Sequence, residues 1–386
     1  MSENSKQDGR LYFLDWLRIL AFVGLVIYHV GMYYVSWNFH VKSPFAGPGL
    51  EPWMKLTEPW RMSLLFMVSG AAAAHMLKSG PSLGLVGRRS AYLLLPLLVG
   101  MVLIVPPQSY FQVVQKFNYS GSYTEFLGLY FSSYQGFCNG TRCLIMPTWN
   151  HLWFLPYLWA YTMLVCALLA IWPSGLRSAA WLLERILRGV WLLLIPAALV
   201  LVARLTLFEK YPSTHALFGD WFNHAIYFGM FATGAALATG KNMWERMASV
   251  RWLALGLAFA FWAYLVFVRP PKPLEHAVVA VYQWSALVAC FGFAVRFLNK
   301  DWPIRKQLAE AVFPVYIFHQ TVIIVASQIL LPHHIRPSLE APLIIAIAFI
   351  LSYSGYLLVR QFGPLRPLFG LRTAQAKPQV EVRSGA

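Results

Sequence analysis

Long apolar segments alternate with short polar ones along most of this chain. Ten of the apolar segments are long enough to cross a bilayer as helices. They run roughly over residues 12–35, 60–78, 90–108, 150–172, 190–208, 221–239, 252–268, 276–297, 309–331 and 341–360. The pattern predicts an all-α, polytopic membrane protein with about ten transmembrane helices in one domain, residues 1–372, followed by a disordered tail, residues 373–386.

Composition agrees with this pattern. The 386-residue chain is 58% hydrophobic and only 12% charged, about half the charged fraction of a soluble domain. The net charge of +16 would suit nucleic-acid binding in a soluble protein. In a membrane protein, basic cytoplasmic loops account for it, so we expect a lipid bilayer and no nucleic acid as partner.

The distribution of Lys and Arg predicts the orientation. With the N-terminus in the cytoplasm, the cytoplasmic segments carry 20 of these residues and the opposite segments 10. Both termini are therefore predicted to be cytoplasmic. A basic turn with Arg177, Arg185 and Arg188 would join the fourth and fifth helices. The longest loop, about 109–148, would lie outside, where it could cover a site.

Three ionisable side chains follow one stripe of the first apolar segment. Arg18 and His29 are eleven residues apart, close to three helical turns, so they point the same way about 16 Å apart along the axis. Asp15 lies three residues before Arg18 on that stripe and could orient it by a buried pair. Such groups usually face a protein interior or a wet cavity. The spacing predicts a polar path, although a snorkelling arginine and an interfacial histidine remain alternatives.

His29 would lie toward the outer face, where an imidazole can act as a general base on a hydroxyl or accept a group itself. His319 lies near the middle of the ninth segment, with Tyr316 one turn earlier on the same face. A buried imidazole there indicates either function or a structural hydrogen bond between helices.

Three more places are candidates. Asn150 and His151 open the fourth segment among large aromatic residues, as an acceptor platform or an aromatic belt with a capping Asn. Arg88 and Arg89 precede the third segment, where two guanidiniums would suit donor phosphates or simply obey the positive-inside rule. Ser69, followed by Gly70, marks the path or a close helix contact.

Other signals are weaker. Cys138 and Cys143 flank a short polar loop, and a disulfide is plausible if that loop faces an oxidising compartment. The chain has no Walker, Rossmann or zinc pattern, so we expect no metal and no bound cofactor.

These residues together resemble the acyltransferase 3 family of integral membrane proteins over nearly the whole chain. The opening from Arg10 to His29 is similar to that family's Arg-(ten residues)-His signature. Ser69-Gly70 and the segments 151–155 and 316–320 resemble later landmarks in the expected order. Residues 37–43 resemble the glucan biosynthesis protein C branch, which is associated with succinyl transfer to periplasmic glucans. In the family, two arginines three apart often precede the third helix; here Arg89 matches the first, but Tyr92 replaces the second.

The resemblance implies a membrane O-acyltransferase of the cell (inner) membrane. It would move an acyl group, acetyl or succinyl, from cytoplasmic acyl-CoA as co-substrate to a hydroxyl of an extracytoplasmic sugar or glycan. In this hypothesis His29 is the base or a transient acyl carrier and Arg18 positions the donor. His319 and His151 line the path. The alternatives are an exporter of an acylated or anionic solute, which would use the same stripe as a permeation path, and a non-catalytic scaffold.

Overall fold

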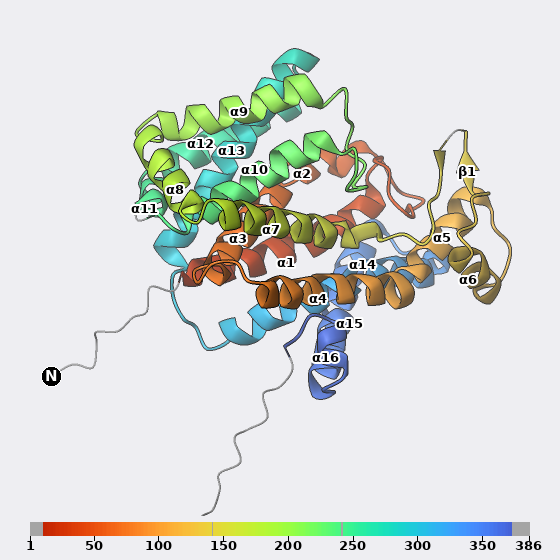
Figure 1. Cartoon of the computed structure of the whole chain (residues 1–386). Coiled ribbons are helices and arrows are strands. Elements are labelled where there is room, and N and C mark those ends of the chain that lie inside the picture. The colour runs from red at the N-terminus through yellow and green to blue at the C-terminus, as the bar shows by residue number, and fades with distance from the viewer. Residues whose placement is uncertain (1–10, 141, 241, 373–386) are drawn as a thin grey trace, which may run out of the picture.

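The protein is described here by a computed structural model that covers residues 11–140, 142–240 and 242–372 (Figure 1). Nearly all regular structure in these ranges is helical, which confirms the all-α class. The predicted disordered tail, residues 373–386, lies outside the described residues. The helices and strands are α1 (Tyr12–Tyr34), α2 (Glu51–Met54), α3 (Arg61–Met76), α4 (Leu83–Val99), α5 (Pro106–Phe117), α6 (Tyr123–Phe131), β1 (Cys138–Asn139), β2 (Arg142–Cys143), α7 (Phe154–Ile171), α8 (Gly175–Ile186), α9 (Trp191–Leu207), α10 (Trp221–Leu237), α11 (Met243–Ser249), α12 (Arg251–Ala263), α13 (Lys272–Phe297), α14 (Arg305–Leu330), α15 (Pro337–Gln361) and α16 (Leu365–Leu368). Short 3-10 turns occupy Pro48–Leu50, Asn150–Trp153 and Leu331–His333, and π-helical turns extend α4 over Gly100–Ile104 and α12 over Tyr264–Val268.

Every predicted membrane segment contains a helix. Within the described ranges, seven helices are long and apolar enough to span a bilayer: α1, α4, α7, α12, α13, α14 and α15, some with their adjoining turns. The helices α8 and α9 would add an eighth span if taken together, although they meet at 114°. The segments predicted at 60–78, 190–208 and 221–239 contain α3, α9 and α10, of 16 or 17 residues each. The count of ten and the cytoplasmic termini stay predictions.

Helix α4, which corresponds to the third predicted membrane segment, begins earlier than predicted. Its N-cap is Ser82, whose side chain accepts a hydrogen bond from the Leu85 N–H, and it extends through the π-helical turn to residue 104. Arg88 and Arg89 therefore lie within the helix instead of before it. The predicted start at residue 90 was wrong because a helix can continue past the edge of its apolar stretch when a capping residue satisfies its first N–H groups.

The expected basic turn between the fourth and fifth segments is instead the amphipathic helix α8. Its apolar residues Leu176, Ala180 and Leu183 recur at helical spacing, and Ala180 is buried. The turn prediction failed because arginines at the other positions of the helix mask that short apolar stripe. At its end the chain bends sharply into α9.

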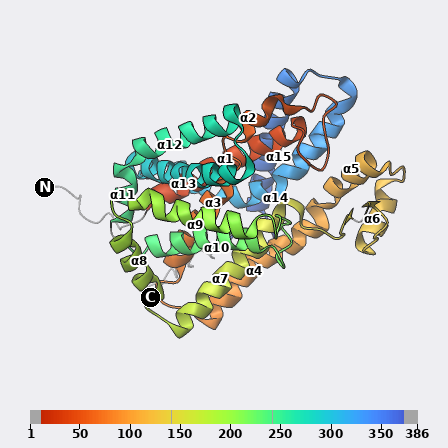
Figure 2. The same cartoon turned by 90° about the horizontal axis from the view of Figure 1, so that it is seen from above.

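The predicted long loop, residues 109–148, is largely structured. It contains most of α5, all of α6 and the two-residue hairpin β1–β2, which project together from one end of the helical body (Figures 1 and 2). The Ser122 side chain and Glu125 form a capping box that starts α6. Cys138 and Cys143 are joined by a disulfide that closes the hairpin. The loop prediction overlooked these short, locally capped elements.

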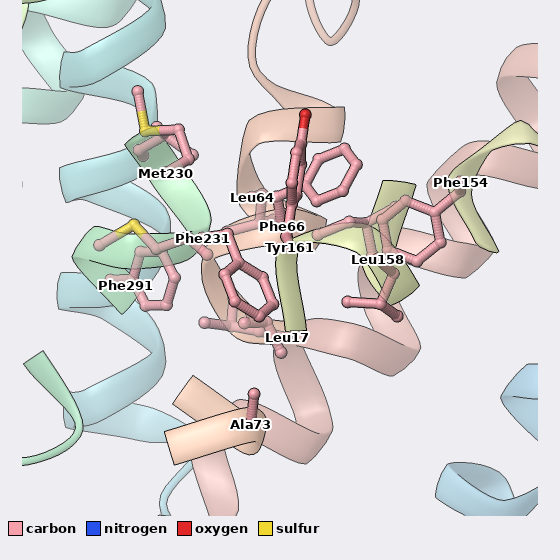
Figure 3. Close-up of a cluster of buried hydrophobic side chains, with 14 of the residues drawn as sticks. Leu17, Leu64, Phe66, Ala73, Phe154, Leu158, Tyr161, Met230, Phe231 and Phe291 are labelled. Atoms are coloured by element: carbon pink, nitrogen blue, oxygen red, sulfur yellow. The ribbon is translucent and has the colours of Figure 1, made fainter. Parts of the chain in front are cut away.

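The main core cluster takes aliphatic and aromatic side chains from most of the long helices, and aromatic rings of α3 and α7 meet within it (Figure 3). The ring of Phe66 on α3 lies 4.7 Å from that of Phe154 and 5.5 Å from that of Tyr161, both on α7. Helix α3 packs most extensively on α10. Glycine permits this approach, because a Cβ at Gly70 would lie 1.9 Å from the carbonyl oxygen of Phe231. The close helix contact expected from Ser69-Gly70 is therefore present.

Helix α1 packs against α3, α13, α14 and α15 (Figure 2). Its most extensive contact is with α14. At its C-terminal end the Lys42 ammonium donates to the carbonyl of Met32, 2.6 Å away, and to that of Val35. These bonds satisfy carbonyls that have no partner within the helix and fix the end of α1 that carries His29.

Candidate active site

Arg18 and His29 both face cavities inside the protein. Three cavities follow one another along α1 and α3, and we name them inner, middle and outer after the predicted orientation. The inner cavity, about 1230 Å³, includes Asp15. The middle cavity, about 290 Å³, includes Arg18, and the outer cavity, about 790 Å³, includes His29.

The cavities adjoin one another through shared walls. The inner and middle cavities share Ala72 and Arg372. The middle and outer cavities share four large side chains, Phe22, Leu65, Phe154 and Tyr316, which we call the partition. Phe22 and Tyr316 contact edge to face, with ring centroids 5.5 Å apart. A path from Arg18 to His29 therefore passes an apolar partition made by α1, α3, α7 and α14.

His29 is paired with His319 across α1 and α14. The His29 Nδ1 lies 2.8 Å from the His319 Nε2, and the two rings are nearly parallel. The His319 Nδ1 lies 2.6 Å from the carbonyl oxygen of Tyr316. A carbonyl only accepts, so this Nδ1 must donate its hydrogen. In a neutral ring the Nε2 of His319 then accepts, and the Nδ1–H of His29 donates to it.

This chain of bonds determines which atom of His29 is available. With its hydrogen on Nδ1, the ring carries its lone pair on Nε2. No hydrogen-bond partner for Nε2 is found among the described residues, and the His29 side chain lines the outer cavity. The arrangement is that of an imidazole whose tautomer is fixed from behind and whose basic nitrogen is free.

His151 has a different position. Its Nε2 donates to the Ile317 carbonyl, 3.1 Å away, and its Nδ1 accepts from the Gln108 amide at 3.2 Å. Gln108 also accepts from Asn150 and Gln320. Both ring nitrogens of His151 are thus occupied, as are those of His319. The His319 side chain is fully buried and lines none of the three cavities. Of the three candidate histidines, only His29 keeps a free nitrogen.

The acidic partner expected for Arg18 binds another arginine more closely. Asp15 forms an ion pair with Arg305, whose side chain is 1% exposed and also pairs with Asp301 at 2.8 Å. The Arg18–Asp15 separation is 3.8 Å, and both side chains are partly exposed. Arg18 instead donates to the Ala309 carbonyl at 3.0 Å. The expected buried pair is therefore a partly exposed one, because α14 supplies a more deeply buried cation.

The other predicted site residues have three different locations. Ser69 and Arg89 line the middle cavity beside Arg18, and the Arg89 guanidinium lies 5.5 Å from the centre of the Tyr92 ring. Arg88 is exposed and lines none of the three cavities. Asn150 and Tyr316 line the outer cavity. The hydroxyl of Tyr316 donates to the His151 carbonyl at 2.6 Å.

The outer cavity has further polar groups on its rim. Burial lowers the pKa of His215 to about 4, and burial likewise lowers the pKa of His40 to about 4, so both rings are neutral near pH 7. His215 stacks on Trp153 with ring centroids 4.1 Å apart. Among the residues the structure describes, no group of three or more His, Cys, Asp or Glu side chains is arranged to hold a metal ion.

The sequence model of one family, described as an acyltransferase domain, matches residues 11–357. The chain belongs to the acyltransferase 3 family. No curated protein and no solved structure matches it significantly. The family match does not distinguish branches within the family. Together with the apolar helices, it identifies this acyltransferase as a multi-pass membrane protein.

Three residues in or near the cavities of this acyltransferase were not among the predicted site residues. Gln108 looked like the polar end of a membrane segment, yet its amide joins four partners in the core. Arg305 counted as ordinary cytoplasmic charge. Arg61 counted as ordinary outer charge, yet it lines the outer cavity with His29. Their positions at segment ends concealed them, because charge is common there.

Proposed function

We propose that the protein is a membrane O-acyltransferase that uses acyl-CoA from the cytoplasm and acylates a hydroxyl of an extracytoplasmic glycan. It would reside in the cell (inner) membrane with both termini in the cytoplasm. The observation that carries the proposal is the free Nε2 of His29 in the outer cavity, held in the basic tautomer by His319.

The donor would enter from the inner cavity. The walls of the inner cavity include Lys78, Arg177 and Arg372, three cations suited to the phosphates of a CoA nucleotide. The narrower middle cavity continues from it past Arg18 and Arg89. The separation of Arg18 and His29 along α1, about 16 Å, is too large for two groups acting on one atom. It suits a long donor held at one end and reacting at the other.

The chemistry at His29 has two possible routes. In the direct route, the Nε2 removes the proton of the acceptor hydroxyl while its oxygen attacks the thioester carbon. The C–S bond breaks, and the CoA thiolate takes the proton from the imidazolium. In the carrier route, the Nε2 attacks the thioester carbon and the C–S bond breaks, which releases the CoA thiolate. The acceptor hydroxyl oxygen then bonds to the acyl carbon as the N–C bond breaks, and the hydroxyl proton passes to the thiolate. In both routes His319 acts as a positioning residue, because it contacts His29 and not the cavity.

The acyl group and the acceptor are narrower parts of the proposal. The resemblance of residues 37–43 to the glucan branch supports succinyl, and acetyl is the other candidate. An extracytoplasmic sugar fits the aromatic and polar walls of the outer cavity, including Trp149, Trp153 and Asn150, since apolar ring faces and hydrogen-bonding groups both recognise sugars.

The test compares His29→Ala with the exposed His333→Ala as a matched control. Both variants should insert into the membrane at normal levels. We expect His29→Ala to abolish acylation of envelope glycans, measured as added mass by mass spectrometry, while His333→Ala acylates normally. Normal acylation by a folded His29→Ala protein would refute the role of His29. Purified protein in detergent should also release CoA when given acyl-CoA and acceptor, with no membrane potential or gradient, whereas an exporter would not cleave the thioester.

A further inference from the structure

Two arginines in the outer cavity have no acidic partner within ion-pair distance among the described residues. Arg61 is the first residue of α3, and Arg204 lies in the last turn of α9. Both line the cavity that contains His29. The Nε and Nη1 of Arg61 and the Nε of Arg204 are buried without a hydrogen-bond partner. Buried donors of a charged group are costly to leave unpaired, so these side chains favour binding of an acceptor.

Aromatic rings pack against both guanidiniums. The Arg61 guanidinium carbon lies 3.3 Å from the centre of the Tyr28 ring. That of Arg204 lies 5.0 Å from the Phe208 ring and 5.7 Å from the Phe222 ring. Stacking on a ring face uses the face of the guanidinium, while its donors project in the plane. Such an edge binds the paired oxygens of a phosphate or carboxylate.

The carboxylates on the same walls do not neutralise this pair. Glu58 and Glu275 line the outer cavity, and both act on the charge of Arg204 from beyond ion-pair distance. Glu58 is exposed, and Glu275 is partly exposed. With Lys55, the cavity walls carry three permanent cations against two carboxylates. The walls of the outer cavity therefore carry a net excess of one positive charge.

Arg61 also lies near the reacting centre, within electrostatic range of His29. Arg61 stacks on Tyr28, the residue next to His29, and Tyr227 lies within electrostatic range of both guanidiniums. We propose that Arg61 and Arg204 bind an oxyanion carried by the acceptor, a phosphate or a carboxylate, and thereby place a neighbouring hydroxyl at His29. This inference rests on the proposed function and names the chemical class of its acceptor: an anionic glycan.

The experiment uses purified protein in detergent and three matched acceptors. They are a neutral gluco-oligosaccharide, the same oligosaccharide with one phosphate monoester, and the same oligosaccharide with one uronic acid carboxylate. We expect the ratio of kcat/KM for an anionic acceptor to that for the neutral one to be at least about tenfold in the wild type. The anionic acceptor with the larger ratio identifies the group. Equal kcat/KM for all three acceptors would overturn the proposal.

Variants locate the effect. Arg61→Gln and Arg204→Gln should each reduce that ratio about tenfold or more, whereas Arg61→Lys should keep part of it because it keeps the charge but not the planar fork. Lys210→Gln, at an exposed cation outside the cavity, is the matched control and should leave the ratio as in the wild type. A ratio that persists in both glutamine variants would overturn the assignment to these residues.

Direct binding separates this proposal from the proposed function. Isothermal titration of the wild type with the three oligosaccharides, without acyl-CoA, needs no catalysis and no variant. Tighter binding of an anionic oligosaccharide supports the arginine site even if no acyl transfer occurs, in which case only the proposed function fails. If acyl transfer occurs but the wild type binds all three equally, the proposed function stands and the arginine site is refuted.

Discussion

Replacing His319 tests the tautomer argument most directly. His319 is fully buried and touches the chemistry only through His29. In His319→Phe, the ring of similar size keeps the packing but removes both the acceptor for the His29 Nδ1–H and the donor to the Tyr316 carbonyl. The His29 ring is then free to rotate and to place its hydrogen on Nε2.

The magnitude follows from two contributions. Losing one neutral hydrogen bond costs about 0.5–1.5 kcal/mol, which is tenfold or less in rate. Losing the correct tautomer removes the general base, which contributes about 10²–10⁴-fold. We therefore expect kcat of His319→Phe to fall at least about a hundredfold, with little change in KM for either substrate, because His319 lines none of the cavities.

The conservative variant and a stability measurement separate positioning from folding. In His319→Gln, the amide oxygen can accept from the His29 Nδ1–H, so we expect kcat to recover to within about tenfold of the wild type. Steady-state CoA release measures kcat, and thermal unfolding in detergent shows whether each variant is folded. A folded His319→Phe protein with more than a tenth of the wild-type kcat would refute the reasoning, as would equal losses in both variants.

Three further predictions concern stability, each measured by thermal unfolding in detergent. Gly70→Ala would place a methyl 1.9 Å from the Phe231 carbonyl oxygen, about 1 Å inside contact distance. We expect the free energy of unfolding to fall by about 1–3 kcal/mol. An unchanged Tm would contradict the close packing of α3 on α10. Asp15→Asn removes one of two carboxylates paired with buried Arg305 and should cost about 1–3 kcal/mol at neutral pH, whereas a wild-type Tm would show that the pair is unimportant. The pKa of His215 is about 4 in the folded protein, against its ordinary 6.5, so the unfolded state binds this proton first as the pH falls. The free energy of unfolding should therefore decrease as the pH drops from about 6.5 to 4. His215→Asn should reduce this pH dependence, and an identical pH profile for the variant and the wild type would refute the prediction.

Local pattern was sufficient for the long apolar helices and for the direction of the α1 stripe. Apolar length alone predicted the seven helices that are long and apolar enough to span a bilayer among the described residues, because a bilayer imposes a minimum apolar length on each span. The three-turn spacing predicted that Arg18 and His29 would share a side, and both do face cavities. Local pattern failed where apolar periodicity is short, as in α8, and where polar sequence hides capped helices, as in α6.

Tertiary structure alone decided which groups meet. His29 and His319 are 290 residues apart, and nothing in either segment specifies the other ring or the tautomer that their contact imposes. The same holds for Asp15. Arg18 lies three residues from it on α1, yet Arg305 of α14 makes the closer ion pair with it. Helical periodicity is a property of a few consecutive residues, so it determines which way a side chain points. Its partner depends on how distant helices pack, and that follows from the shapes and burial of the whole bundle.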